Sequence, residues 1–152
     1  MNEASLEISL GNELREIAGV AAQVDRFCAD HRLMPGLAYA VNLAIDEILT
    51  NTISYGYEDR ERHRIEVIVN LEADQLVVVI VDDSMPFDLG LAPERDLDLS
   101  IEDTALGGLG LYLVHQMMDR VDYRREAGCN IVTLVKGTGR HEDLNGTRAV
   151  RE

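Results

Sequence analysis

The sequence predicts a single α+β domain, because two segments have the spacing of amphipathic helices and two others have the pattern of antiparallel hairpins. Residues 13–30 and 38–57 carry apolar side chains at three- and four-residue steps, as a helix with one buried face requires. Residues 65–81 and 120–136 each contain two candidate strands separated by a tight turn. Such short links cannot carry a parallel crossover, so the paired strands are predicted to be antiparallel.

Length, composition and charge fit one soluble globular domain and exclude several functions. The 152 residues are enough for a single core, and 46% of them are hydrophobic while 28% are charged. A formal net charge of −14 argues against binding to nucleic acids or to anionic membranes. The sequence shows no membrane-span pattern, no signal peptide and no P-loop motif. Cys28 and Cys129 have no zinc or redox spacing, so we expect reduced thiols and a cytoplasmic location.

The two ends of the chain are predicted to differ in order. A strand at residues 5–10 opens the chain, since its apolar and polar residues alternate. Asn12 follows it and is placed to cap the first helix. Residues 137–152 are polar with little apolar content, so we expect a frayed tail after a domain that spans residues 1–136.

The helix at 38–57 contains two polar residues that a purely structural helix does not need. Pro35 and Gly36 mark its start, since Pro is tolerated in the first turn of a helix, and Gly56 marks its end. Glu47 and Asn51 are four residues apart, so their side chains are neighbours on one face, beside the apolar stripe. A carboxylate next to an amide oxygen suits Mg²⁺, and the carboxylate also suits the role of general base. The same pair fits an ordinary solvated helix face, so the spacing alone leaves these interpretations open.

The most apolar strand, at 75–81, ends in the polar residues Asp82, Asp83 and Ser84. Acids at the end of a buried strand form either a solvent-facing turn or a group placed for a ligand. A long loop at 89–106 follows, and connections of this length in compact domains are usually functional lids or disordered segments.

Three glycines, Gly107, Gly108 and Gly110, stand between this loop and a helical pattern at 111–120. Glycines that open a helix let backbone N–H groups approach an anion, and the helix N-terminus favours negative charge. A glycine cluster alone is a weak signal. The lid candidate before it and the helix after it strengthen the prediction of a phosphate-binding turn.

In this order the segments resemble the GHKL ATPase superfamily, which includes gyrase, heat-shock chaperones and histidine kinases. Within it they are more similar to the small anti-sigma serine kinases of bacteria, the RsbW and SpoIIAB type. The likeness rests on residues 46–57, 80–88, 107–126 and 130–136, and it covers nearly the whole chain up to Lys136. The resemblance implies a Bergerat fold, a two-layer sandwich with helices on one face of a mixed, mostly antiparallel sheet.

The resemblance also implies a site for ATP and Mg²⁺. Asn51 would hold Mg²⁺ at the ATP phosphates, Glu47 would take the proton from an incoming serine hydroxyl, and Asp82 would accept a hydrogen bond from the adenine amino group. Phosphoryl transfer depends on this kind of positioning and charge neutralisation. The further nucleotide contacts implied by the resemblance come from Thr133 beside Asp82 and from the backbone of Gly107, Gly108 and Gly110.

Two positions depart from the family pattern. Ser84 stands where the family usually has the glycine of D-x-G, and Tyr55 stands where it often has histidine. If the position of Ser84 needs a positive φ or a close approach to adenine, a serine there weakens nucleotide binding. In the alternative interpretation, the Ser84 hydroxyl joins the nucleotide site without harm.

The activity that the resemblance implies is that of a Mg²⁺-ATP-dependent serine kinase in a partner-switching pathway. Such a protein phosphorylates a STAS-type anti-anti-sigma protein, sequesters a sigma factor and forms a homodimer. The intact Glu47 and Asn51 favour this enzyme. Ser84 leaves open a catalytically weak module whose nucleotide alters partner binding. A detached histidine-kinase ATPase domain is a third interpretation, and the absence of a dimerisation helix with its own histidine counts against it.

Overall fold

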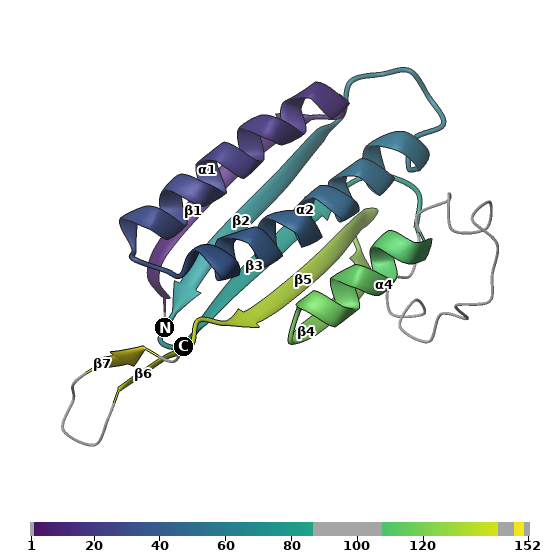
Figure 1. Ribbon diagram of the computed structural model, residues 1–152. Helices are drawn as coiled ribbons and strands as arrows, with labels where there is room; N and C mark the ends of the chain where they lie inside the picture. Colours follow the sequence, from purple (N-terminus) through teal and green to yellow (C-terminus); the bar gives the residue numbers. More distant parts are fainter. Residues whose placement is uncertain (1, 87–107, 143–147, 151–152) are drawn as a thin grey trace.

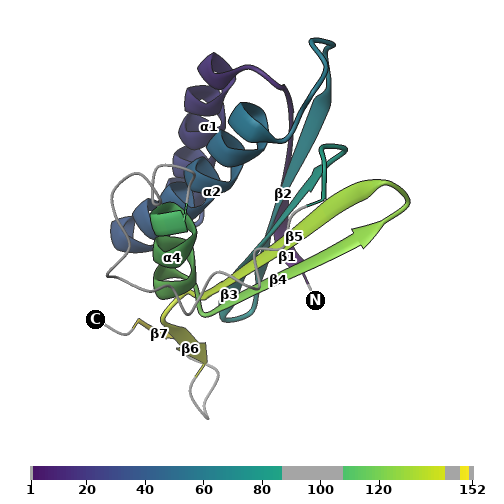
Figure 2. The same ribbon diagram turned by 90° about the vertical axis from the view of Figure 1, so that its right-hand side faces the viewer.

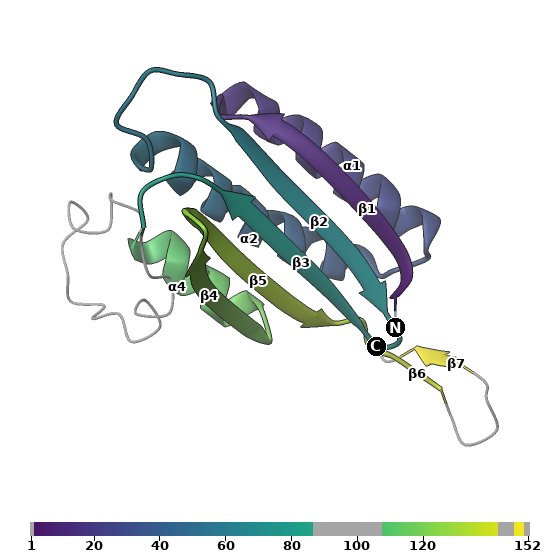
Figure 3. The same ribbon diagram turned by 180° about the vertical axis from the view of Figure 1, so that it is seen from behind.

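Helices cover one face of a five-stranded sheet in the computed structural model, which describes residues 2–86, 108–142 and 148–150 (Figure 1). Viewed from the side, the helices form one layer and the strands the other (Figure 2). Viewed from behind, the strands face the reader with all the described helices beyond them (Figure 3). The elements in chain order are β1 (Asn2–Gly11), a 3-10 turn η1 (Leu14–Glu16), α1 (Ile17–Asp30), α2 (Pro35–Tyr55), β2 (Arg64–Glu72), β3 (Gln75–Asp82), α4 (Gly108–Met117), β4 (Arg120–Glu126), β5 (Cys129–Gly137), β6 (Arg140–Glu142) and β7 (Arg148–Val150).

The sheet has the order β1-β2-β3-β5-β4, and each neighbouring pair is antiparallel. The β2–β3 and β4–β5 pairs are the two hairpins that the short turns predicted. Strand β3 pairs with β5 across the connection that contains α4. The predicted α+β fold with helices on one face is confirmed. The described sheet is antiparallel throughout, where the resemblance implied a mixed one.

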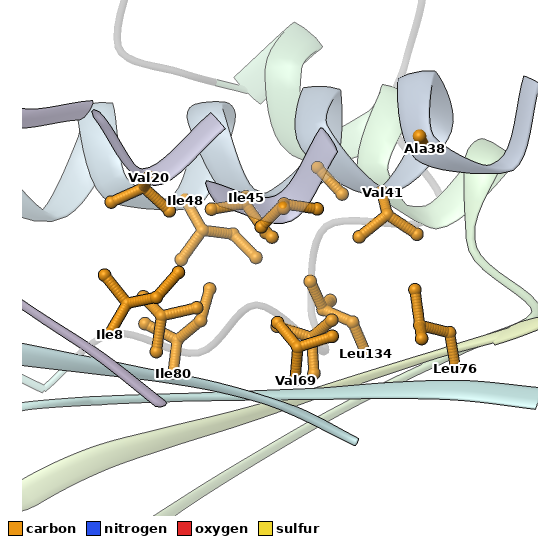
Figure 4. Close-up of a cluster of buried hydrophobic side chains, with 14 of the residues drawn as sticks. Ile8, Val20, Ala38, Val41, Ile45, Ile48, Val69, Leu76, Ile80 and Leu134 are labelled. Atoms are coloured by element: carbon orange, nitrogen blue, oxygen red, sulfur yellow. The ribbon is translucent and has the colours of Figure 1, made fainter. Parts of the chain in front are cut away.

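The core lies between the helical layer and the sheet, with α2 at its centre (Figure 4). Ile45 and Ile48 of α2 are fully buried, because the helical period turns them toward the strands. Ile80 of β3 and Leu134 of β5 meet them from the sheet, where alternate residues face the helices. Burying one such side chain stabilises the fold by about 1.5–3 kcal/mol. This packing fixes α2, and with it the polar residues at its edge, against the sheet.

One helix boundary matches its prediction and another differs in a way that affects the site. Helix α2 begins at Pro35, as the sequence indicated, because the missing N–H of proline costs nothing in the first turn. Helix α4 starts at Gly108, so Gly108 and Gly110 lie inside its first turn and not in a preceding loop. It ends at Met117, and the next residues join the sheet, where the Asp119 N–H donates to the Val135 carbonyl at 2.9 Å. None of the described helices is both long and apolar enough to cross a membrane.

The prediction that Asn12 caps the first helix is wrong. That helix begins with the turn η1, whose N-terminal flanking residue Glu13 makes no side-chain cap bond. The Asn12 Oδ1 accepts from the His63 N–H at 3.0 Å, and its Nδ2 donates to the Glu61 carbonyl at 3.2 Å. Asn12 therefore ties the end of β1 to the segment before β2.

The tail at 137–152 contains more structure than the sequence predicted. Strand β5 continues to Gly137, and the Thr138 N–H donates to the Asp74 carbonyl at 2.8 Å. Strands β6 and β7 then pair with each other, Arg140 opposite Val150. The domain boundary after residue 136 stays a prediction. The loop at 89–106, predicted to be a lid, lies outside the described residues.

Candidate functional site

Glu47 lies half-buried on α2, beside the start of α4. Burial raises the pKa of its carboxyl group, and the neighbouring carboxylate of Asp46 raises it further. A Cβ atom added at Gly110 of α4 would lie 2.9 Å from Glu47 Cδ and would overlap one of the carboxylate oxygens. With any larger residue at position 110, the Glu47 carboxylate would have to move from this place. A carboxyl group with a raised pKa, held in this way, is suited to accept a proton.

Asn51 lies one helical turn after Glu47 and is also half-buried. Its Nδ2 atom is buried and has no hydrogen-bond partner among the described residues. The fold therefore does not use the full hydrogen-bonding capacity of this amide. The amide oxygen of Asn51 and the carboxylate of Glu47 are the hard oxygen donors that Mg²⁺ prefers.

Asp82 ends β3 with its side chain on the helix-facing side of the sheet, and it is almost completely buried. Its Oδ1 accepts three hydrogen bonds, from the Ser84 N–H at 2.9 Å, from Ser84 Oγ and from Asn130 Nδ2 at 2.9 Å. Its Oδ2 is buried and has no partner within the described part of the chain. A buried polar atom left without a partner costs about 1–3 kcal/mol. This oxygen is therefore placed to accept a hydrogen bond from a ligand.

Ser84 fits its position without backbone strain. Among the described non-glycine residues only Arg32 and Ala127 have a positive φ, so Ser84 does not occupy a conformation that requires glycine. Its hydroxyl donates to Asp82, and the space beside it is provided by Gly56 at the end of α2. A Cβ added at Gly56 would lie 2.7 Å from Ser84 Cβ. The Gly56 carbonyl also accepts from the Met85 N–H at 2.9 Å, which joins the end of α2 to the end of β3.

Thr133 does not lie beside Asp82, contrary to what the resemblance implied. In the β3–β5 ladder Thr133 stands opposite Val79, whereas Asp82 stands opposite Asn130. Side chains alternate between the two faces of a strand, and Asn130 and Val132 are buried under the helices. Thr133 therefore points to the other face of the sheet.

Asn130 is the residue that the sequence analysis missed. Its side chain is fully buried and donates to Asp82 across the sheet. The sequence contains a sign of this, because every second residue of a strand lies on the same face. Asn130 therefore shares a face with the apolar Val132 and Leu134. A polar residue on the buried side of a strand needs a polar partner. Only the register between β3 and β5 shows that this partner is Asp82.

An ionic cluster surrounds His63 next to Asp83. The His63 ring stacks on Tyr57 with a centroid distance of 4.3 Å. Its Nδ1 lies 3.0 Å from Asp83 Oδ2 and its Nε2 lies 2.8 Å from Asp59 Oδ1. These hydrogen bonds raise the pKa of His63, and the bond to Asp59 has the larger effect. Burial, followed by the charges of Asp82 and Asp83, raises the pKa of Tyr57 above its ordinary value.

The site residues come from four elements that meet at one edge of the sandwich. Glu47 and Asn51 come from α2, Gly110 from α4, Asp82 from β3 and Asn130 from β5. Their donor set fits ATP with Mg²⁺, since Asp82 Oδ2 is an unsatisfied acceptor and the first turn of α4 offers backbone N–H groups that suit a phosphate. Gly108 opens α4 as a phosphate-binding turn would require, whereas Gly107 lies outside the described residues.

Comparison with known proteins agrees with this arrangement. Residues 10–136 match the family described as the histidine kinase-like ATPase domain. The serine-protein kinase RsbW of Bacillus velezensis is 26% identical over 114 residues, which cover 70% of this chain and 69% of that protein. The anti-sigma F factor of Clostridium beijerinckii is 27% identical over 96 residues, which cover 63% of this chain and 67% of that protein.

A solved structure shows the same fold. The RsbU and RsbW domains of a Mycobacterium tuberculosis protein superimpose with a TM-score of 0.60 at 15% identity. The likeness covers 88% of this chain but only 32% of that longer one. The chain thus belongs to the histidine kinase-like ATPase domain family, and the resemblance to GHKL kinases of the RsbW type that its motifs indicated is confirmed.

Proposed function

We propose that this protein is a Mg²⁺-ATP-dependent protein serine kinase that acts as an anti-sigma factor. The observation that carries the proposal is the contact between Glu47 and the glycine turn at Gly110, because it puts a proton acceptor beside a turn suited to phosphates. The names of the similar proteins, serine-protein kinase RsbW and anti-sigma F factor, support the same activity.

Asp82 and Asn51 would orient the nucleotide. Asp82 Oδ2, which has no partner among the described residues, would accept from the adenine amino group. Asn51 would hold Mg²⁺ through its amide oxygen. When bound, Mg²⁺ neutralises charge that builds up on the phosphate oxygens. Backbone N–H groups at Gly108 and Gly110 in the first turn of α4 would donate to the same phosphates.

Glu47 would supply the one proton transfer that the reaction needs. Its carboxylate accepts the proton of a serine hydroxyl as the serine oxygen bonds to the γ-phosphorus. The bond from that phosphorus to the β–γ bridging oxygen breaks, and ADP leaves. The raised pKa of Glu47 makes its carboxylate a stronger base than an ordinary glutamate.

The partners follow from the relatives and remain part of the proposal. The phosphate acceptor would be a STAS-type anti-anti-sigma protein, and the sequestered partner would be a sigma factor. A homodimer in the cytoplasm, without direct contact to nucleic acid or membrane, completes the proposal. The acidic charge of −14 is consistent with partners that are proteins and not nucleic acids.

The alternative, a catalytically weak module that only binds partners, was based on Ser84. Ser84 has no positive φ, and its hydroxyl joins the hydrogen bonds around Asp82. The backbone at Ser84 therefore gives no reason to expect weak nucleotide binding. We keep the kinase as the proposed function.

Phosphate transfer from γ-labelled ATP tests the proposal. The protein is incubated with Mg²⁺, labelled ATP and the small acceptor protein that co-purifies with it, and the label is then exposed to acid. We expect an acid-stable label on the acceptor, lost by about 100-fold or more in Glu47→Gln. Glu7→Gln, a change at an exposed carboxylate on the edge strand β1, is the matched control and keeps the activity. An acceptor that binds but stays unlabelled, or an acid-labile label, contradicts the serine kinase.

A further inference from the structure

Behind Asp82 lies a network of buried and half-buried polar groups that the nucleotide contacts above do not use. Asn130 is its centre and is fully buried. The Asn130 Nδ2 lies 2.9 Å from Asp82 Oδ1, 3.0 Å from Ser84 Oγ and 3.0 Å from the Met85 carbonyl. On the other side, Asn130 Oδ1 accepts from the Tyr123 hydroxyl at 2.6 Å.

Arg125 closes the network from β4. Its Nη1 donates to Asn130 Oδ1 at 3.0 Å and to the Ser84 carbonyl at 2.9 Å, and its Nη2 donates to the Gly128 carbonyl at 3.2 Å. One guanidinium therefore contacts the strand end that carries Asp82, the turn between β4 and β5, and the amide of Asn130. Because its fork is planar and always charged, it fixes these three groups relative to one another.

The orientation of the Asn130 amide follows from its neighbours. If its oxygen and nitrogen were exchanged, the oxygen would face the Asp82 carboxylate and the NH₂ group would face the Arg125 guanidinium. Both contacts would be repulsive, since the first joins two acceptors and the second joins two donors. The amide is thus held with its donor toward Asp82.

This arrangement assigns different tasks to the two oxygens of Asp82. Oδ1 is fully occupied by Asn130 and by the N–H and hydroxyl of Ser84. Oδ2 has no partner among the described residues. These three hydrogen bonds fix the plane of the carboxylate, so one of its oxygens stays occupied while the other has no partner within the described part of the chain.

We propose that Asn130 is a positioning residue that sets the base selectivity of the nucleotide site, by holding Asp82 so that Oδ2 faces the bound base as a pure acceptor. This inference rests on the proposed function. A base with an amino group at its 6-position satisfies Oδ2. A 6-oxo purine presents an acceptor there and is rejected, and a purine without a 6-substituent leaves Oδ2 unsatisfied.

The test is a ratio of affinities and not a single affinity. Dissociation constants with Mg²⁺ are measured for ATP, for GTP and for purine riboside triphosphate, which lacks the 6-amino group. For the wild type we expect ATP to bind about 10- to 100-fold more tightly than purine riboside triphosphate, as one hydrogen bond to a charged acceptor allows. In Asn130→Ala, ATP and purine riboside triphosphate should bind with dissociation constants within about threefold of each other. The affinity for purine riboside triphosphate should be almost unchanged from the wild type.

Two further variants separate positioning from folding. Thr133→Val changes the same strand on the opposite face of the sheet, so it should keep the wild-type ratio. Asn130→Ser keeps a hydroxyl donor and should retain part of the ratio. Asn130→Ser also carries the test if Asn130→Ala does not fold.

The outcomes distinguish the two proposals. If the Asn130 variants weaken ATP and the analogue equally and keep the ratio, Asn130 is only structural and the inference is overturned. If the wild type binds ATP and the analogue equally, Asp82 does not read the base and the inference also fails. A wild type that binds none of the three nucleotides contradicts the proposed function itself.

Discussion

At the scale of single residues, the site depends on one glycine that leaves room for one carboxylate. Gly110 has no side chain at the point where α4 meets Glu47, and any Cβ there would displace the Glu47 carboxylate. Burial then raises the pKa of the carboxyl group that the glycine admits. Position and basicity of Glu47 thus come from the same packing of α4 on α2.

Gly110→Ala should reduce phosphate transfer by about 100-fold, because a displacement of about 1 Å at a reacting group costs this much. The measurement is kcat of the variant against wild type, with circular dichroism as a check of the fold. Gly19→Ala, in α1, is the matched control, because a Cβ there meets no atom within 4 Å. An unchanged kcat in Gly110→Ala would show that Glu47 does not act from this position.

Glu47→Gln should raise the melting temperature at neutral pH while it removes activity. The folded-state pKa of Glu47 is raised, so its ionised form opposes folding at all pH values above that pKa. Below about pH 4 the carboxyl is protonated in the folded and the unfolded chain, and the two proteins should melt alike. Thermal melts from pH 4 to 8 measure this difference. A variant that melts below the wild type at pH 7 would contradict the burial of a charged Glu47.

At the scale of elements, the ionic cluster around His63 joins the segment between α2 and β2 to the end of β3. His63 stands between Asp59 and Asp83 and stacks on Tyr57. The pKa of His63 is raised and the pKa of Asp59 is lowered by their contact. The ion pairs of this cluster therefore form fully only at pH values where His63 is protonated and Asp59 is ionised.

His63→Phe keeps a ring against Tyr57 and removes the charge, so its effect should depend on pH. The contribution of His63 is complete below its unfolded pKa of about 6.5 and is lost as pH rises through the higher folded pKa. The contribution of Asp59 is lost as pH falls through its lowered pKa, below about pH 4. The melting temperature of the variant should thus fall furthest below that of the wild type near pH 5–6. At pH 9 the two melting temperatures should be similar.

The control for this prediction is His31→Phe, because the His31 ring also contacts an aromatic ring, that of Phe27 at 4.6 Å. Its melting temperature is measured at the same pH values, so that the effect of replacing an imidazole by a phenyl ring is separated from the effect of the two carboxylates. A His63→Phe variant whose loss of stability is equal at all these pH values would show that the ring packs but carries no charge.

The hairpin between β4 and β5 contains a turn where a residue change should stabilise the fold. Ala127 has φ 53° and Gly128 has φ 78°, as a type I′ turn requires at both central positions. Alanine is strained there, whereas asparagine tolerates this conformation. Ala127→Asn should raise the free energy of unfolding by about 1 kcal/mol, and Ala127→Val should lower it. Urea denaturation measures both, and a destabilised Ala127→Asn would contradict this description of the turn.

At the scale of the whole molecule, the sequence predicted those features that depend on local spacing. Apolar periodicity located α1, α2 and both hairpins, and the position of Asp82 at a strand end followed from its neighbours. Features that depend on register were missed or misplaced. Thr133 lies on the face of the sheet opposite to Asp82, and Asn12 bonds to a distant loop, because each position is decided by pairing across the sheet.

We propose that α2, the end of β3 and the start of α4 form one site for ATP and Mg²⁺, and a crystal structure with Mg²⁺ and a non-hydrolysable ATP analogue is the measurement that decides it. We expect the adenine amino group on Asp82 Oδ2, the metal ion on Asn51 Oδ1, and the γ-phosphate beside Glu47 and the first turn of α4. A nucleotide bound elsewhere, or bound with its base away from Asp82, would contradict this site.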